Sequence, residues 1–118
     1  MLFNLGMPAR AESRAVATVF ALPAGVPLAA GETLQVAIRI ADVTDLYAFD
    51  LEVHFDPTTI EVTSVDLGTF LDSGIEFSSI EQVEGIISFA NTQLNPSVPK
   101  SGEGDLILIN IKALVSLE

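Results

Sequence analysis

The sequence predicts an all-β fold, a sandwich or a barrel, from three observations. Apolar and polar residues alternate with period two in several segments, as they do in strands that bury one face. Roughly seven such short segments are separated by turn signals, namely Ala24-Gly25, Ala30-Gly31, Ser73-Gly74 and Ser101-Gly102. No segment shows a sustained helical period, so βαβ units are not expected.

Two neighbouring segments carry the clearest alternation. From Thr33, the apolar positions are Leu34, Val36, Ile38 and Ile40. In the next segment one face holds Phe49, Leu51, Val53 and Phe55, and the other holds Asp50, Glu52, His54 and Asp56. A shift of one residue would bury all the polar groups of that second segment, so its register is strongly specified.

Further strands follow from turn chemistry and β-rich composition. Asp56-Pro57-Thr58-Thr59 predicts a tight turn. The other expected strands are Ile60 to Val65, Val16 to Ala21, Ile75 to Ile80, Gly85 to Thr92 and Leu106 to Leu114. We expect a helical turn at Leu67 to Asp72, and a loop at Leu94 to Gly104, where proline and glycine recur.

Composition predicts one folded domain. The chain has 118 residues, 49% of them hydrophobic, and a mean hydropathy of +0.50, which argues against disorder despite the net charge of -11. That charge repels nucleic acid and anionic membranes, so we expect neither as a partner. No apolar run approaches the roughly 20 residues of a membrane span. Cysteine is absent, which excludes disulfides and thiolate chemistry.

The two ends are expected to lie outside the domain. Ala9-Arg10-Ala11 fits the small-x-small pattern before a signal-peptidase site, so residues 1–14 are interpreted as an N-terminal extension or the remnant of an export signal. An arbitrary boundary of the chain is the alternative. The domain is then expected at residues 15–116, and residues 117–118 are expected to be left over from a cloning site.

Six segments in one order resemble the cohesin domains of bacterial scaffold proteins. They are Ala30-Gly31-Glu32-Thr33, Leu46-Tyr47-Ala48-Phe49-Asp50-Leu51, Val53-His54-Phe55-Asp56-Pro57, Ile60-Glu61-Val62, Gly85-Ile86-Ile87-Ser88-Phe89-Ala90 and Ser101-Gly102-Glu103-Gly104-Asp105-Leu106. Each is weak alone, but their common order and spacing span most of residues 15 to 114. The resemblance implies a nine-stranded jelly-roll sandwich, of the type shared with carbohydrate-binding modules.

The resemblance also implies a function and a departure from the family pattern. Cohesins bind a dockerin module and thereby assemble enzymes on extracellular or cell-surface scaffolds of bacteria or archaea, in cellulosome-like systems linked to polysaccharide degradation. A further strand normally follows the one matching Leu106 to Leu114. Here the sandwich is expected to lack that last strand, and the open edge favours a homodimer unless residues 1 to 14 cover it.

The candidate partner-binding residues are Asp50, Glu52, His54, Asn91, Thr92 and Leu108. Asp50 matches the acidic position at which cohesins accept hydrogen bonds from dockerin. Glu52 and His54 share its face by alternation, and Asn91 and Thr92 end the strand that neighbours it in the family. Leu106 and Leu108 lie on the face of their strand opposite its main apolar face, so we expect something to cover them. The cover is a partner that also contacts Asp50, a second copy of the chain, or the loop Leu94 to Pro99.

We expect a non-catalytic module with no cofactor or metal. Pairs such as Asp50 with Glu52 or Glu81 with Glu84 resemble acid/base couples, but on alternating strands they are typical of a solvated face. His54 is the single histidine, too few for a zinc site, and the aspartates lack calcium-loop spacing.

Two other functions compete with dockerin binding. A carbohydrate-binding module that takes polysaccharide would need exposed aromatic rings, whereas tryptophan is absent and Tyr47 is the only tyrosine. A structural or adhesin domain of a surface protein would need no dockerin at all.

Overall fold

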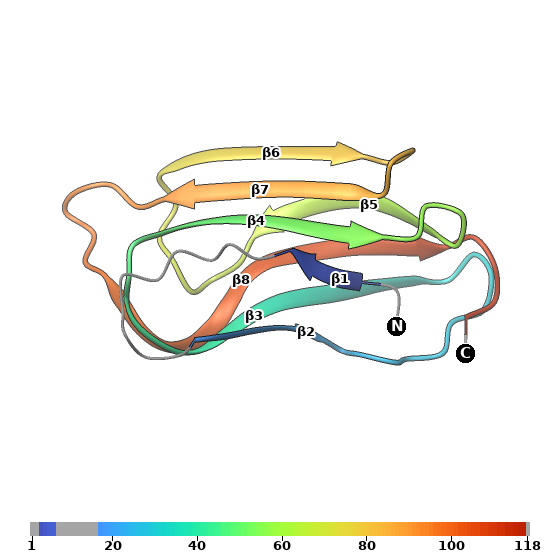
Figure 1. Cartoon of the computed structure of the whole chain (residues 1–118), viewed down its shortest axis with the longest axis horizontal. Helices are drawn as coiled ribbons and strands as arrows, with labels where there is room; N and C mark the ends of the chain where they lie inside the picture. The colour runs from blue at the N-terminus through green and yellow to red at the C-terminus, as the bar shows by residue number, and fades with distance from the viewer. Residues whose placement is uncertain (1–2, 7–16, 118) are drawn as a thin grey trace.

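The protein is a sandwich of two four-stranded antiparallel sheets, described by a computed structural model for residues 3–6 and 17–117 (Figure 1). Sheet A has the strand order β1-β4-β7-β6, and sheet B has the order β2-β3-β8-β5. The strands are β1 (Phe3–Gly6), β2 (Thr18–Leu22), β3 (Thr33–Leu46), β4 (Ala48–Phe55), β5 (Ile60–Leu67), β6 (Ile75–Glu81), β7 (Ile86–Thr92) and β8 (Lys100–Ala113). The all-β prediction is confirmed.

The core lies between the two sheets and follows the predicted alternation. In β4 the apolar positions are buried and the intervening ones face outward. Phe49 of β4 stacks on Phe89 of β7 with ring centroids 6.1 Å apart, and Ile38 and Ile109 are buried in sheet B. Each such buried side chain stabilises the fold by roughly 1.5–3 kcal/mol, so apolar burial holds the two sheets together.

A bulge in β8 explains why Leu106 breaks the alternation. Ile107 pairs with Ile38, but Asp105 pairs with the next residue, Arg39, so Leu106 is an extra residue on β8. Leu106 and Ile107 are therefore both buried. The segment that lies along this part of β8 is the one following β5, because Gly68 N donates to the Leu106 carbonyl at 2.8 Å. The expected cover by the loop Leu94 to Pro99 was wrong for Leu106.

Two other local predictions were wrong. The expected helical turn at Leu67 to Asp72 is the end of β5 followed by a bend that hydrogen-bonds to β8. The expected loop at Leu94 to Gly104 is loop only as far as Pro99, since β8 begins at Lys100, opposite Leu46 of β3. Both errors concern segments whose conformation depends on a distant strand rather than on local composition.

The sandwich takes in residues on either side of the expected domain, 15–116. Phe3–Gly6 belong to the extension 1–14, whose cover of an open edge was the alternative to a homodimer, and they form β1, which pairs with β4 in sheet A. Leu117 forms a bridge with Leu28. The described residues thus form eight strands, against the nine implied by the resemblance. Residues 7–14 lie outside the described part, and the origin of both ends stays a prediction.

The exposed edge of β5 is tied to the opposite sheet by one side chain. Gln82, in the turn between β6 and β7, accepts from Val62 N at 3.0 Å and donates to the Ile60 carbonyl at 2.9 Å. Its amide thus takes the place of a neighbouring strand at the start of β5, which is an edge strand of sheet B. A bulge between Val62 and Ser64 further interrupts that edge.

Replacing Gln82 by alanine is expected to lower the free energy of unfolding by about 1–3 kcal/mol, because the amide leaves two part-buried backbone groups without a partner. Gln35→Ala is the matched control, since Gln35 is exposed and makes one long side-chain bond, 3.3 Å to Asn110. Its loss should stay below about 0.5 kcal/mol. Urea denaturation followed by circular dichroism measures both, and equal losses would contradict the bridging role of Gln82.

Candidate functional site

The outer face of sheet A is the candidate site, because it carries most of the predicted residues. The cross-strand register places its side chains in rows that run from β6 through β7 to β4. These rows are Ile75–Thr92–Ala48, Phe77–Ala90–Asp50, Ser79–Ser88–Glu52 and Glu81–Ile86–His54.

This face is apolar along one strand and acidic along another. Ile75 and Phe77 of β6 are 65% and 63% exposed, which is unusual for side chains of that size. Asp50 and Glu52 of β4 are exposed as well. The β7 residues between them are mostly small: Thr92, Ala90, Ser88 and Ile86.

His54 is paired on this face with a carboxylate of its own strand, not with Asp56. Its Nε2 lies 2.6 Å from Glu52 Oε1, two residues away on the same strand. Asp56 instead accepts from Thr58, through both the hydroxyl (2.6 Å) and the backbone N–H (2.9 Å). The hydroxyl bond and then the backbone bond lower the pKa of Asp56, which therefore acts as a turn residue.

The structure brings together four of the six predicted residues. Asp50, Glu52, His54 and Thr92 all belong to the outer face of sheet A. Asn91 was wrong as a rim contact: it lies in the buried phase of β7 because Thr92 and Ala90 take the outer phase.

The predicted patch combining Leu108 with Asp50 was also wrong. Leu108 belongs to β8 in sheet B, where it is partly exposed between Ala37 of β3 and Asp66 of β5. Asp50 belongs to sheet A, so the two residues point away from opposite sides of the sandwich. Alternation in the sequence indicates which residues of a strand share a face, but not which sheet the strand joins.

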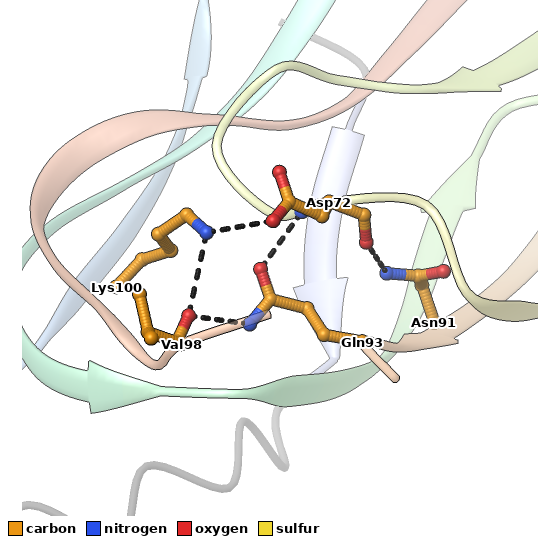
Figure 2. Close-up of polar contacts among 5 residues, drawn as sticks. All are labelled: Asp72, Asn91, Gln93, Val98 and Lys100. Carbon is orange, nitrogen blue, oxygen red and sulfur yellow. Dashed lines mark hydrogen bonds and ion pairs between the residues drawn. The ribbon is translucent and has the colours of Figure 1, made fainter. Parts of the chain in front are cut away.

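Buried amides organise the end of the sandwich where β6 begins and β7 ends (Figure 2). Asn91 Nδ2 donates to the Asp72 carbonyl at 3.2 Å, and Gln93 Oε1 accepts from Asp72 N at 2.8 Å. Gln93 Nε2 donates to the Val98 carbonyl at 2.7 Å. We call these contacts, with Lys100, the polar latch; it joins the segment before β6 to the loop after β7.

Lys100 completes the polar latch by its charge. Its Nζ lies 2.9 Å from Asp72 Oδ2 and 3.3 Å from the Val98 carbonyl. The hydrogen bond from Lys100 is the main cause that lowers the pKa of Asp72. The ion pair therefore persists at neutral pH and is lost only as the pH falls through that lowered value.

Sequence reasoning missed Ile75 and Phe77 as surface residues. The alternation Ile75-Glu76-Phe77-Ser78 predicts a strand with its apolar side buried. In the structure this apolar phase faces outward, and β6 is an edge strand with few covering neighbours. The rule that the apolar phase of a strand is buried, which holds for β4, therefore fails for β6.

Within residues 3–6 and 17–117, no three acidic or histidine side chains gather as metal ligands would. The same part of the chain holds no helix with the length and apolar character needed to cross a bilayer.

Comparison with known proteins agrees with this architecture. The family model described as "Cohesin domain" matches residues 22–117. A curated relative, "Cellulose-binding protein A" of Clostridium cellulovorans, is 32% identical over 103 residues, which cover 86% of this chain and 6% of that protein.

Solved cohesin structures share the fold. A type II cohesin domain from the cellulosome of Acetivibrio cellulolyticus has a TM-score of 0.67 at 16% identity and covers 86% of this chain and 69% of its own. The third cohesin of ScaC from the same organism, in complex with the ScaB dockerin, gives 0.64 at 22%, with 72% and 62% covered. A non-cellulosomal cohesin from Archaeoglobus fulgidus gives 0.64 at 17%, with 83% and 65% covered.

The chain thus spans a small part of the curated relative and less than two thirds of two of these solved chains. The family match nevertheless covers almost all of residues 17–117, including every strand from β3 to β8. The chain belongs to the cohesin domain family.

Proposed function

We propose that the outer face of sheet A binds a dockerin-type protein module. One observation carries the proposal: the exposed ring of Phe77 and the exposed carboxylate of Asp50 stand in the same cross-strand row, with only Ala90 between them. The ScaC cohesin that shares this fold is in complex with a dockerin, which supports the choice of partner.

As a cohesin domain, the chain is a non-catalytic binding module. This agrees with the contacts on the face, where the single histidine is paired with Glu52 and Asp56 is engaged in a turn.

The dimensions of the row suit a helical element of the partner. Neighbouring strands lie about 4.8 Å apart, so Phe77 and Asp50 are separated by roughly 10 Å across the face. This is close to the diameter of an α-helix with its side chains, about 10–12 Å. One helix lying over Ala90 can therefore bury an apolar side chain on Phe77 and offer a basic or hydroxyl group to Asp50. Apolar anchors supply affinity, and the acidic side steers a basic partner.

We further propose that the module works in an extracellular or cell-surface assembly linked to polysaccharide degradation. Support comes from the curated relative, which is named as a cellulose-binding protein, and from the type II cohesin of a cellulosome. The non-cellulosomal cohesin of Archaeoglobus fulgidus indicates that the same fold also serves outside cellulosomes.

Direct carbohydrate binding is less well supported by the described side chains. Sugar-binding platforms stack several aromatic rings against sugar faces. Within residues 17–117, Phe77, at 63%, is the one aromatic side chain that is mostly exposed. A structural or adhesin role stays a prediction. A homodimer through an open sheet edge also stays a prediction, and Gln82 partly covers one such edge, that of β5.

Calorimetry against a panel of calcium-loaded dockerins tests the proposal. The parent chain is expected to bind at least one, and Asp50→Ala and Phe77→Ala are each expected to weaken that binding about tenfold or more, or roughly 1.4 kcal/mol. Asp66→Ala is the matched control: it removes an exposed strand carboxylate from sheet B, so its effect should stay below about threefold.

Two results would contradict the proposal. Silence of the folded parent across a broad panel would favour a structural domain, or a glycan-binding one if a polysaccharide pull-down is positive. Binding that Asp66→Ala weakens as much as Asp50→Ala would move the contact away from sheet A.

A further inference from the structure

β6 is the edge strand least protected against pairing with another strand. Its register with β7 runs without a shift over all its residues, and it contains neither proline nor a basic residue. The other described edge strands are shorter, as β1 and β2 are, or interrupted, as β5 is by its bulge and by Gln82. In Figure 1, β6 is the uppermost strand, with no element drawn beyond it. Within the described part of the chain, one side of its backbone therefore has no strand partner.

Both faces of β6 are exposed, which is unusual for a strand of a sandwich. On the outer face, Ile75 and Phe77 are mostly exposed. On the inner face, Ile80 is 38% exposed, and Glu76 and Ser78 are exposed as well, although their cross-strand partners on β7 are buried. A further strand beside β6 would cover part of these apolar side chains on both faces.

The sequence of β6 is complementary to itself in an antiparallel pair. In a symmetric pair, a two-fold axis centred on Ser78 is the one arrangement that pairs all seven residues of the strand. The facing residues of the two copies are then Ile75 with Glu81, Glu76 with Ile80, Phe77 with Ser79, and Ser78 with Ser78. No carboxylate of β6 faces another carboxylate in this register. The two Phe77 side chains lie diagonally across the pair, roughly 7–8 Å apart, which is within reach of aromatic rings.

We propose that β6 pairs with β6 of a second copy, so that two four-stranded sheets join into one eight-stranded sheet around a two-fold axis at Ser78. A second copy fits better than an unrelated strand, because the pattern of β6 opposes apolar and acidic side chains in the register that pairs every residue. Seven paired residues make a small interface, so we expect a reversible dimer with a Kd between about 10 μM and about 1 mM. This pairing does not depend on the proposed binding of a dockerin.

Self-pairing and dockerin binding are expected to compete, and this step alone rests on the proposed function of sheet A. The two-fold axis is perpendicular to the sheet, so the outer faces of both copies point to the same side. Ala90 of β7 pairs with Phe77, so the two Ala90 residues are three strand spacings apart, or roughly 14 Å across the sheet. Each face then has room for one helix of about 10–12 Å but not for a wider module. A saturating partner should therefore convert the dimer into complexes of one chain with one partner.

Substitution of Ser78 tests the pairing by sedimentation velocity of the chain alone, over the concentration range of the expected Kd. Ser78→Lys puts two like charges face to face, so the dimer should weaken about tenfold or more, although the net charge of -11 becomes less negative. Thr18→Lys is the matched control, because it adds the same charge to an exposed residue of β2, an edge strand of sheet B. Its effect should stay below about twofold.

A mixture of two variants tests the register. Ser78→Lys and Ser78→Asp each repel their own copies, whereas a mixed pair brings opposite charges together. The mixture is therefore expected to form a heterodimer at least as tight as the dimer of the parent chain. Circular dichroism and thermal unfolding check that both variants remain folded, as expected for an exposed position.

Each outcome bears on one step. A parent chain that stays monomeric throughout the concentration range overturns the pairing, as does a dimer that Ser78→Lys and Thr18→Lys weaken equally. If the two Ser78 variants do not associate with each other, the register centred on Ser78 is overturned. Complexes of two chains with two dockerins would overturn the competition and leave the pairing intact. Failure of the folded parent to bind any dockerin would overturn the proposed function, whereas the dimer is measured without one.

Discussion

The antiparallel pairing of β4 with β7 is the interaction on which both the core and the candidate face depend. Its register puts Phe49 and Phe89 in contact between the sheets and, by the same alternation, puts Asp50 and Ala90 side by side on the outside. Slipping β4 by one residue would expose Phe49 and bury Asp50 and Glu52, and slipping β7 would expose Phe89. The core strongly favours one register of β4 against β7. The same register therefore fixes the spacing of the side chains on the outer face.

The end of this sheet is organised by polar groups rather than by apolar packing. Asn91 and Gln93 occupy buried positions where an apolar residue would also fit the alternation, and their amides bind backbone groups of two neighbouring segments. Buried amides are tolerable only when their hydrogen bonds are made, so they specify where those segments lie. The order of the β7–β8 loop, and with it the exposure of Leu94 and Val98, follows from that requirement.

Acidic charge and the state of the sheet edges limit how this chain can associate with other proteins or with a second copy of itself. A net charge of -11 opposes the approach of another acidic surface and favours a basic partner. Gln82 and the bulge in β5 interrupt one edge of sheet B, which reduces the strand available for edge-to-edge pairing.

The sequence by itself determined the class of the fold, the family resemblance and the outward phase of Asp50, Glu52 and His54, because alternation is a local property of each strand. Only the tertiary structure decided which sheet each strand joins. It separated Leu108 from Asp50, turned Asn91 inward, buried Leu106 through a bulge and left Ile75 and Phe77 uncovered on an edge strand. These outcomes depend on pairings between residues far apart in the chain, and no local pattern of apolar and polar residues records which distant strand lies alongside.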